Sequence, residues 1–91
     1  MLSGTCTQVI DGATIEVDFA SRLRLRDVRA PGQFDEGHDE ARANLEALVL
    51  DQTVNYVAVG QSGLSMLADV WVDSFSVNEY MRGCCLAHQG I

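Results

Sequence analysis

The first third of the chain alternates apolar and polar side chains around a turn dipeptide, and this pattern limits the possible folds more than any other feature. Residues 5 to 19 (TCTQVIDGATIEVDF) alternate on both sides of Asp11-Gly12, which predicts two strands joined by a tight turn. Residues 22 to 28 (RLRLRDV) alternate again and predict a third strand, which ends before Pro31-Gly32. Three consecutive strands are therefore expected at the start of the fold.

The rest of the chain adds a helix, two strands and a closing helix. Apolar residues recur at helical spacing from about residue 37, at Ala41, Leu45, Leu48 and Val49. Residues 53 to 59 and 64 to 73 predict two strands separated by a loop at 60 to 63. A capping box that begins at Ser76 predicts a short helix over about 77 to 84. This order predicts a mainly β fold with some α structure: a five-stranded Greek-key barrel of the OB-fold type, with one helix between strands 3 and 4.

Charge and composition exclude several classes of protein. The net charge of -7 and the absence of lysine argue against an extended nucleic-acid surface, because such surfaces use many basic contacts. No apolar stretch approaches the roughly 20 residues of a membrane span, and residues 1 to 20 lack a signal-peptide pattern, so a cytoplasmic location without membrane contact is expected. The cysteines Cys6, Cys84 and Cys85 match neither a disulfide framework nor a zinc half-site.

Five segments, in order along nearly the whole chain, carry a family resemblance. They are VIDGATIEV, RLRLRDVRAPG, GHDEARANLEALV, MLADVWVD and SVNEYMRGCCLA. The sequence resembles the staphylococcal-nuclease-like (thermonuclease) family, and the resemblance implies a single OB-fold domain over residues 1 to 91. Active members of that family are calcium-dependent phosphodiesterases that cleave DNA and RNA.

The resemblance also identifies the positions that carry the family's chemistry. The two metal carboxylates correspond to Ala13 and Arg29, and the proposed general base corresponds to Gly32. Of the two arginines that neutralise the phosphate, Arg24 matches and Ser65 does not. A methyl group cannot bind calcium and an arginine repels it. The resemblance therefore implies a catalytically incompetent domain, with no catalytic residues, no metal and no cofactor expected.

Three functional hypotheses follow, and the first is a protein-interaction or self-association module. The family has a further C-terminal helix that this sequence does not match, so an apolar patch that includes Met81, Cys84 and Leu86 is expected to be exposed. A protein partner or a homo-oligomer would cover such a patch.

The second hypothesis is binding of a nucleotide or single-stranded nucleic acid, without cleavage, through the arginines of the third strand. Arg24, Arg26 and Arg29 are the candidate phosphate ligands. Alternation places Arg22, Arg24, Arg26 and Val28 on one face of the strand and Arg29 on the other. The alternative interpretation is a solvated strand face whose arginines pair across the hairpin with Glu16, Asp18 or Asp27.

The third hypothesis is a calcium-dependent nuclease with a relocated metal site, and it is the only one that requires calcium. Its ligands would come from Asp11, Asp18, Asp27 and Asp35, which are near the family's site in sequence. The histidines offer no substitute, because His38 is expected in the first turn of a helix and His88 in a frayed tail.

Overall fold

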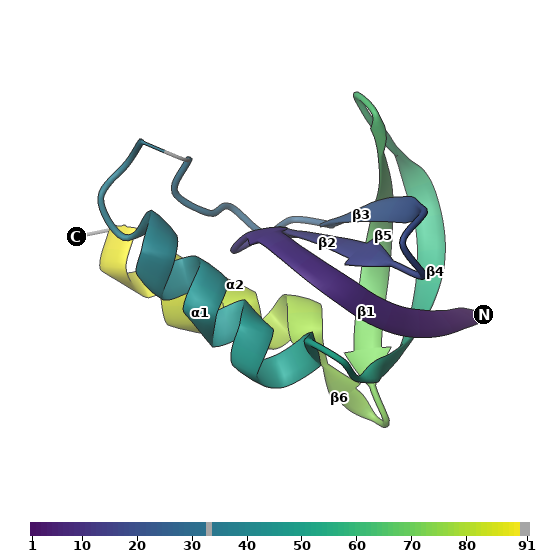
Figure 1. Ribbon diagram of the computed structural model, residues 1–91. Coiled ribbons are helices and arrows are strands. Elements are labelled where there is room, and N and C mark those ends of the chain that lie inside the picture. The colour runs from purple at the N-terminus through teal and green to yellow at the C-terminus, as the bar shows by residue number, and fades with distance from the viewer. Residues whose placement is uncertain (33, 90–91) are drawn as a thin grey trace.

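The computed structural model describes residues 1 to 32 and 34 to 89, and in it five strands close into a barrel (Figure 1). The strands are β1 (Leu2–Asp11), β2 (Thr14–Val17), β3 (Ser21–Leu25), β4 (Thr53–Ser62) and β5 (Ser65–Val72). Their order in the sheet is β3-β2-β1-β4-β5, and a parallel pairing between β3 and β5 closes the barrel. A short strand, β6 (Phe75–Ser76), extends the sheet beyond β5.

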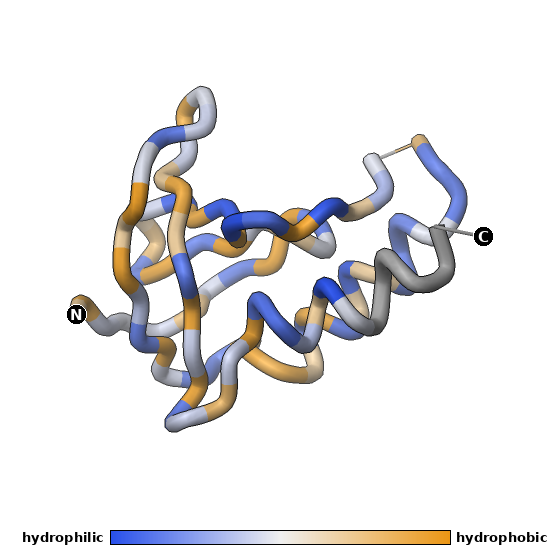
Figure 2. The backbone as a smooth tube through the Cα atoms, turned by 180° about the vertical axis from the view of Figure 1, so that it is seen from behind, coloured by the Kyte–Doolittle hydropathy of each residue, from blue (hydrophilic) through white to orange (hydrophobic). Residues whose placement is uncertain are grey.

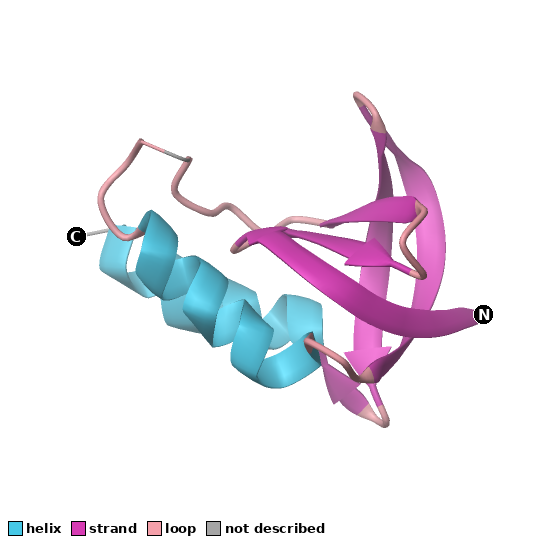
Figure 3. Ribbon diagram, viewed as in Figure 1, coloured by secondary structure: helices cyan, strands magenta, loops and turns pink. Residues whose placement is uncertain are grey.

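Two helices lie side by side on the side of the barrel away from β4 (Figure 1, Figure 3). Helix α1 (His38–Val49) connects β3 to β4, and α2 (Val77–Gln89) follows β6. A barrel of this kind, with a helix between its third and fourth strands, is consistent with the OB-fold-like architecture predicted from the sequence. No helix in the described part of the chain is long and apolar enough to cross a membrane.

The core is built as the hydrophobic patterns predict. Strands β2 and β3 bury Ile15, Leu23 and Leu25 inside the barrel, and α1 presents Ala41, Leu45 and Val49 to it at helical spacing. Helix α2 begins where the capping box predicts, because the hydroxyl of Ser76 accepts a hydrogen bond from the backbone N–H of Glu79 at 3.3 Å.

The third strand is shorter than the alternation predicts. It ends at Leu25, and Arg26 and Asp27 form a turn in which Asp27 has a positive φ of 58°. The turn reverses the alternation, so Val28 is buried at 3% exposure instead of sharing the arginine face. The prediction of a strand to residue 28 was wrong, because this turn is held by a distant contact: the N–H of Arg26 donates to the carbonyl of Ala68 on β5 at 2.9 Å.

Two other boundaries differ from the prediction. Residues 60 to 62 belong to β4 and only Gly63 and Leu64 form the turn, so no loop spans 60 to 63. Helix α2 continues to Gln89, well past the predicted end near 84, and His88 lies in this helix and not in a frayed tail. Gly63 has a positive φ of 61°, which a glycine adopts at little cost and which permits this tight hairpin.

Candidate functional site

A shallow pocket lies between β3 and the loop that leads to α1. It has a volume of about 350 Å³ and is lined by Arg24, Arg29, Ala30, Pro31, Asp35 and Glu36. Two of the three predicted phosphate ligands, Arg24 and Arg29, therefore lie together, although they were expected on opposite faces of one strand. The turn at Asp27 brings them together, because residues after it no longer follow the alternation of β3.

The strand fixes the direction of Arg24. Its neighbours Leu23 and Leu25 are fully buried in the barrel, so the side chain of Arg24 must lie on the outer face. Arg24 pairs in register with Thr14 of β2 on one side and Leu67 of β5 on the other, and its side chain is half-buried. A half-buried guanidinium on a strand with two neighbours is well placed to bind an anion, since its orientation is largely set.

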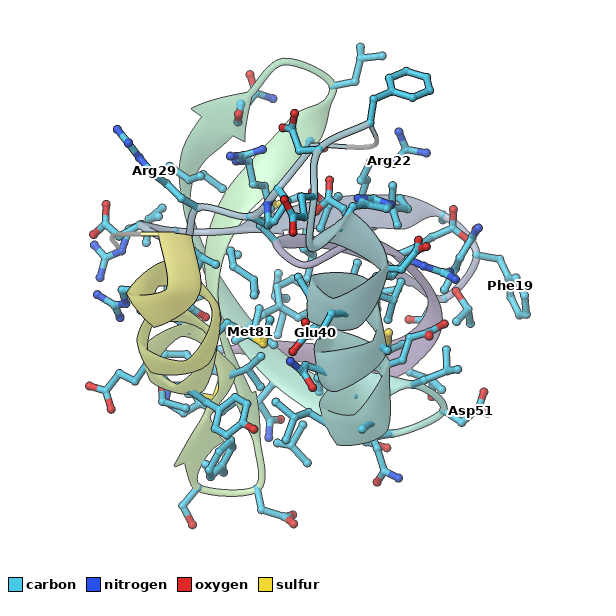
Figure 4. All side chains as sticks on the ribbon, turned by 90° about the vertical axis from the view of Figure 1, so that its left-hand side faces the viewer. Phe19, Arg22, Arg29, Glu40, Asp51 and Met81 are labelled. Carbon is cyan, nitrogen blue, oxygen red and sulfur yellow. The ribbon has the colours of Figure 1, made fainter. Side chains whose placement is uncertain are left out.

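Arg29 comes from the loop after the turn and is more exposed than Arg24. The buried Val28 precedes it and the half-buried Ala30 and Pro31 follow, so the backbone is anchored while the side chain is exposed. Figure 4 shows Arg29 projecting outward from this loop. The side chains of Arg24 and Arg29 form no hydrogen bond or ion pair with any other described residue.

The opposite wall of the pocket is acidic. Asp35 is already engaged in its own loop, because its carboxylate accepts a hydrogen bond from the N–H of Gly32 at 2.9 Å and its N–H donates to the carbonyl of Gly32 at 2.9 Å. Glu36 is exposed beside it. An anion held by the two arginines would therefore also be repelled by two nearby carboxylates, which favours weak binding. Salt screens the attraction of the arginines and competes for them, so it should weaken binding further.

Arg26 does not belong to this pocket. Its guanidinium forms a two-pronged pair with Asp69 of β5, with distances of 2.9 Å from Nη2 to Oδ2 and 3.1 Å from Nε to Oδ1. Its prediction as a phosphate ligand is not supported by this arrangement, and its partner is none of the acidic residues expected across the hairpin. Arg22, by contrast, pairs in register with Glu16, one of those expected partners, and is exposed.

The residues at the family's metal positions do not fit a calcium ion. The side chain of Ala13 is 1% exposed, and its N–H donates to the carboxylate of Asp11 at 2.8 Å. Asp18 is also used locally, since its carboxylate accepts a hydrogen bond from the N–H of Thr5 at 3.0 Å. Within the described ranges, no three His, Cys, Asp or Glu side chains are grouped closely enough to hold a metal ion.

Two further positions of the family's site are also without its chemistry. Gly32, where the family has its general base, is an exposed loop residue without a side chain. Ser65, at the second phosphate position, begins β5 beside the hairpin turn and pairs with Ser62, so it does not line the pocket of Arg24 and Arg29.

Sequence reasoning did not assign the acidic wall of the pocket. Asp35 was proposed as a ligand of a relocated metal site, and Glu36 was given no role in any site. Their position in the sequence could have predicted this wall. Asp35 and Glu36 closely follow Pro31-Gly32, and a turn at these residues brings them back toward Arg29.

An exposed apolar patch was expected to include Met81, Cys84 and Leu86, and this expectation is wrong for Met81. Met81 is fully buried, and Figure 4 shows it between the two helices. The side chains of Cys84 and Leu86 lie outside the described part of the structure. Met81 therefore cannot form part of an exposed interaction surface.

Comparison of the sequence with protein-family models gives no match, and comparison with curated proteins gives none either.

Proposed function

We propose that this chain is a staphylococcal-nuclease-like domain, with that family's Greek-key barrel, that binds a phosphate group of a nucleotide or of single-stranded nucleic acid without cleaving it. The observation that carries the proposal is that Arg24 and Arg29 line one pocket while neither guanidinium forms an ion pair with a described residue. A guanidinium without an acidic partner is free to donate hydrogen bonds to phosphate oxygens.

The absence of cleavage follows from the side chains at the site. Phosphodiester hydrolysis requires stabilisation of the charge that develops on the phosphate and a group that activates or orients the attacking water. Arg24 and Arg29 could supply part of the first requirement. Ala13 and Gly32 have no acid, base or metal-ligating group, so the second requirement has no candidate at the family's positions.

The proposal is tested by calorimetric titration with a nucleoside 3′,5′-bisphosphate at low salt. Arg24→Ala and Arg29→Ala should each weaken binding by roughly tenfold or more, because a hydrogen bond to a charged group contributes about 1.5 to 3 kcal/mol and 1.4 kcal/mol corresponds to tenfold. Arg22→Ala removes the same charge from the same strand outside the pocket and is the matched control, expected to change affinity less than threefold.

Two results would contradict the proposal. One is the absence of saturable binding at low salt. The other is an equal loss of affinity in all three arginine variants, which would indicate a diffuse effect of charge and not a site. Calcium-dependent hydrolysis of single-stranded DNA by the wild-type chain would instead favour a nuclease with a relocated metal site.

A further inference from the structure

The outer half of β4 is a sheet edge that no other described strand covers. Strand β4 pairs with β5 over residues 55 to 62, but with β1 only over residues 53 to 56. Residues 57 to 62 therefore have a strand on one side only, and Figure 1 places this edge opposite the two helices. An edge of this kind presents backbone N–H and C=O groups that can pair with another extended chain.

The features that usually protect such an edge are mostly missing here. Residues 57 to 62 (VAVGQS) contain no proline and no charged side chain. Val57 and Val59 are exposed by 38% and 43%, so apolar surface accompanies the unpaired backbone. The one protective feature is an irregularity between Ala58 and Gly60, which interrupts the register with β5.

The charge distribution indicates what kind of chain would pair with this edge. Residues 52 to 68, which contain β4 and the first four residues of β5, have no charged side chain, although the whole chain has a net charge of -7. The nearest charge on β5 is Asp69, which lies opposite Val57 in register and forms an ion pair with Arg26. A basic peptide would be attracted to acidic side chains elsewhere on this protein and not to the uncharged residues 52 to 68. An uncharged strand is complementary to another uncharged strand, and Figure 2 shows β4 and its hydrophobic stretches at the edge of the molecule.

We propose that residues 57 to 62 of β4 pair antiparallel with the same residues of a second copy of this chain. Identical strands that pair antiparallel are related by a two-fold axis, so each copy satisfies the same edge of the other and the assembly closes as a dimer. Val57 and Val59 of both copies become covered. The pairing is separate from the pocket of Arg24 and Arg29, which lies on β3 and the loop after it.

The dimer responds to salt in the direction opposite to phosphate binding. Each copy has a net charge of -7, so the copies repel, and salt reduces this repulsion as the Debye length falls from about 10 Å at 0.1 M to about 3 Å at 1 M. Dimerisation should therefore strengthen with salt, while phosphate binding should weaken. The opposite salt dependences therefore distinguish a failure of the dimer proposal from a failure of the phosphate-binding proposal.

Sedimentation equilibrium of the full chain at 0.05 M and 0.5 M sodium chloride tests the inference. The wild type should form dimers that are more stable at the higher salt. Val59→Lys should weaken dimerisation at least tenfold, because antiparallel pairing buries its charge close to the edge of the partner copy. Phe34→Lys makes the same change of charge at a residue that is 94% exposed in the loop before α1, and should change dimerisation less than twofold.

Amide hydrogen exchange identifies the residues that form the contact between the two copies. At high protein concentration the amides of residues 57 to 62 should exchange more slowly than at low concentration, and Val59→Lys should remove this difference. The inference is overturned by a chain that remains monomeric at 0.5 M salt and submillimolar concentration. It is equally overturned by a dimer that Phe34→Lys weakens as much as Val59→Lys, or by protection that falls outside residues 57 to 62.

Discussion

One buried asparagine joins α2 to β5 and to the turn after β3, which is distant in the sequence. Asn78, at the start of α2, is 2% exposed and accepts a hydrogen bond from the N–H of Val70 at 2.8 Å. Its amide nitrogen donates to the carbonyls of Ala68 and Arg26, both at 3.1 Å. Because Arg26 begins the turn that brings Arg29 next to Arg24, this side chain supports the geometry of the pocket without contacting it.

Replacing Asn78 with alanine should lower the free energy of unfolding by about 2 to 3 kcal/mol, because the N–H of Val70 and the carbonyl of Arg26 lose a buried partner. Urea unfolding followed by circular dichroism measures the change. Asn44→Ala, on a half-buried position of α1, is the control and should change stability by no more than about 0.5 kcal/mol. A loss at Asn78 no larger than the control's would show that the network contributes little.

Cys6 makes the stability of the fold sensitive to alkaline pH. Burial in the barrel raises the pKa of its thiol from 9.0 to about 11. Between these values the folded state keeps a proton that the unfolded state has lost, so stability is unaffected below pH 9 and falls as the pH rises from 9 toward 11.

Urea unfolding at pH 8 and pH 10.5 tests this expectation, with Cys6→Ala as the matched variant. The wild type should lose more stability between the two pH values than the variant does, since only the wild type has the thiol. An identical loss in both proteins would mean that other groups cause the alkaline destabilisation.

At the scale of elements, two glycines should respond to the same substitution in opposite directions. A Cβ atom on Gly12 would lie 2.7 Å from the Cβ of Ala41 on α1 and 3.0 Å from that of Ala30, so the turn between β1 and β2 can approach the helix only with glycine. Gly83, within α2, has nothing within 4 Å of the corresponding position.

Gly12→Ala should therefore destabilise the fold by about 1 to 3 kcal/mol through overpacking. Gly83→Ala should stabilise it by about 0.5 to 1 kcal/mol, because alanine costs less than glycine in a helix. Thermal unfolding of both variants compares the two effects. A stabilising Gly12→Ala would show that α1 is free to move away from the turn.

The sequence was informative about elements wherever a local pattern decides them. The alternation around Asp11-Gly12, the apolar spacing of α1 and the capping box at Ser76 all lie within a few residues and predicted real elements. The end of β3 depends on Ala68, far along the chain, and no local pattern contains that information. The same turn explains why Arg24 and Arg29 meet in one pocket although strand alternation placed them on opposite faces.

At the scale of the whole molecule, charged groups are divided among distinct surfaces. Four of the six arginines lie between residues 22 and 29, two of them in the pocket, while residues 52 to 68, from the start of β4 into β5, have no charged side chain. The chain has 13 Asp and Glu residues against six arginines, which gives the net charge of -7. A local anion site on an acidic protein favours a small phosphate ligand or a short strand over a long duplex.

The most direct test of the central claim is an amide NMR titration of the wild-type chain with a nucleoside 3′,5′-bisphosphate, with and without calcium. Binding at the pocket predicts saturable shifts confined to residues 22 to 32 and their neighbours Asp35 and Glu36, with the same affinity in both conditions. Saturable shifts that require calcium, or no shifts at low salt, would contradict the claim that Arg24 and Arg29 form a phosphate site that acts without a metal.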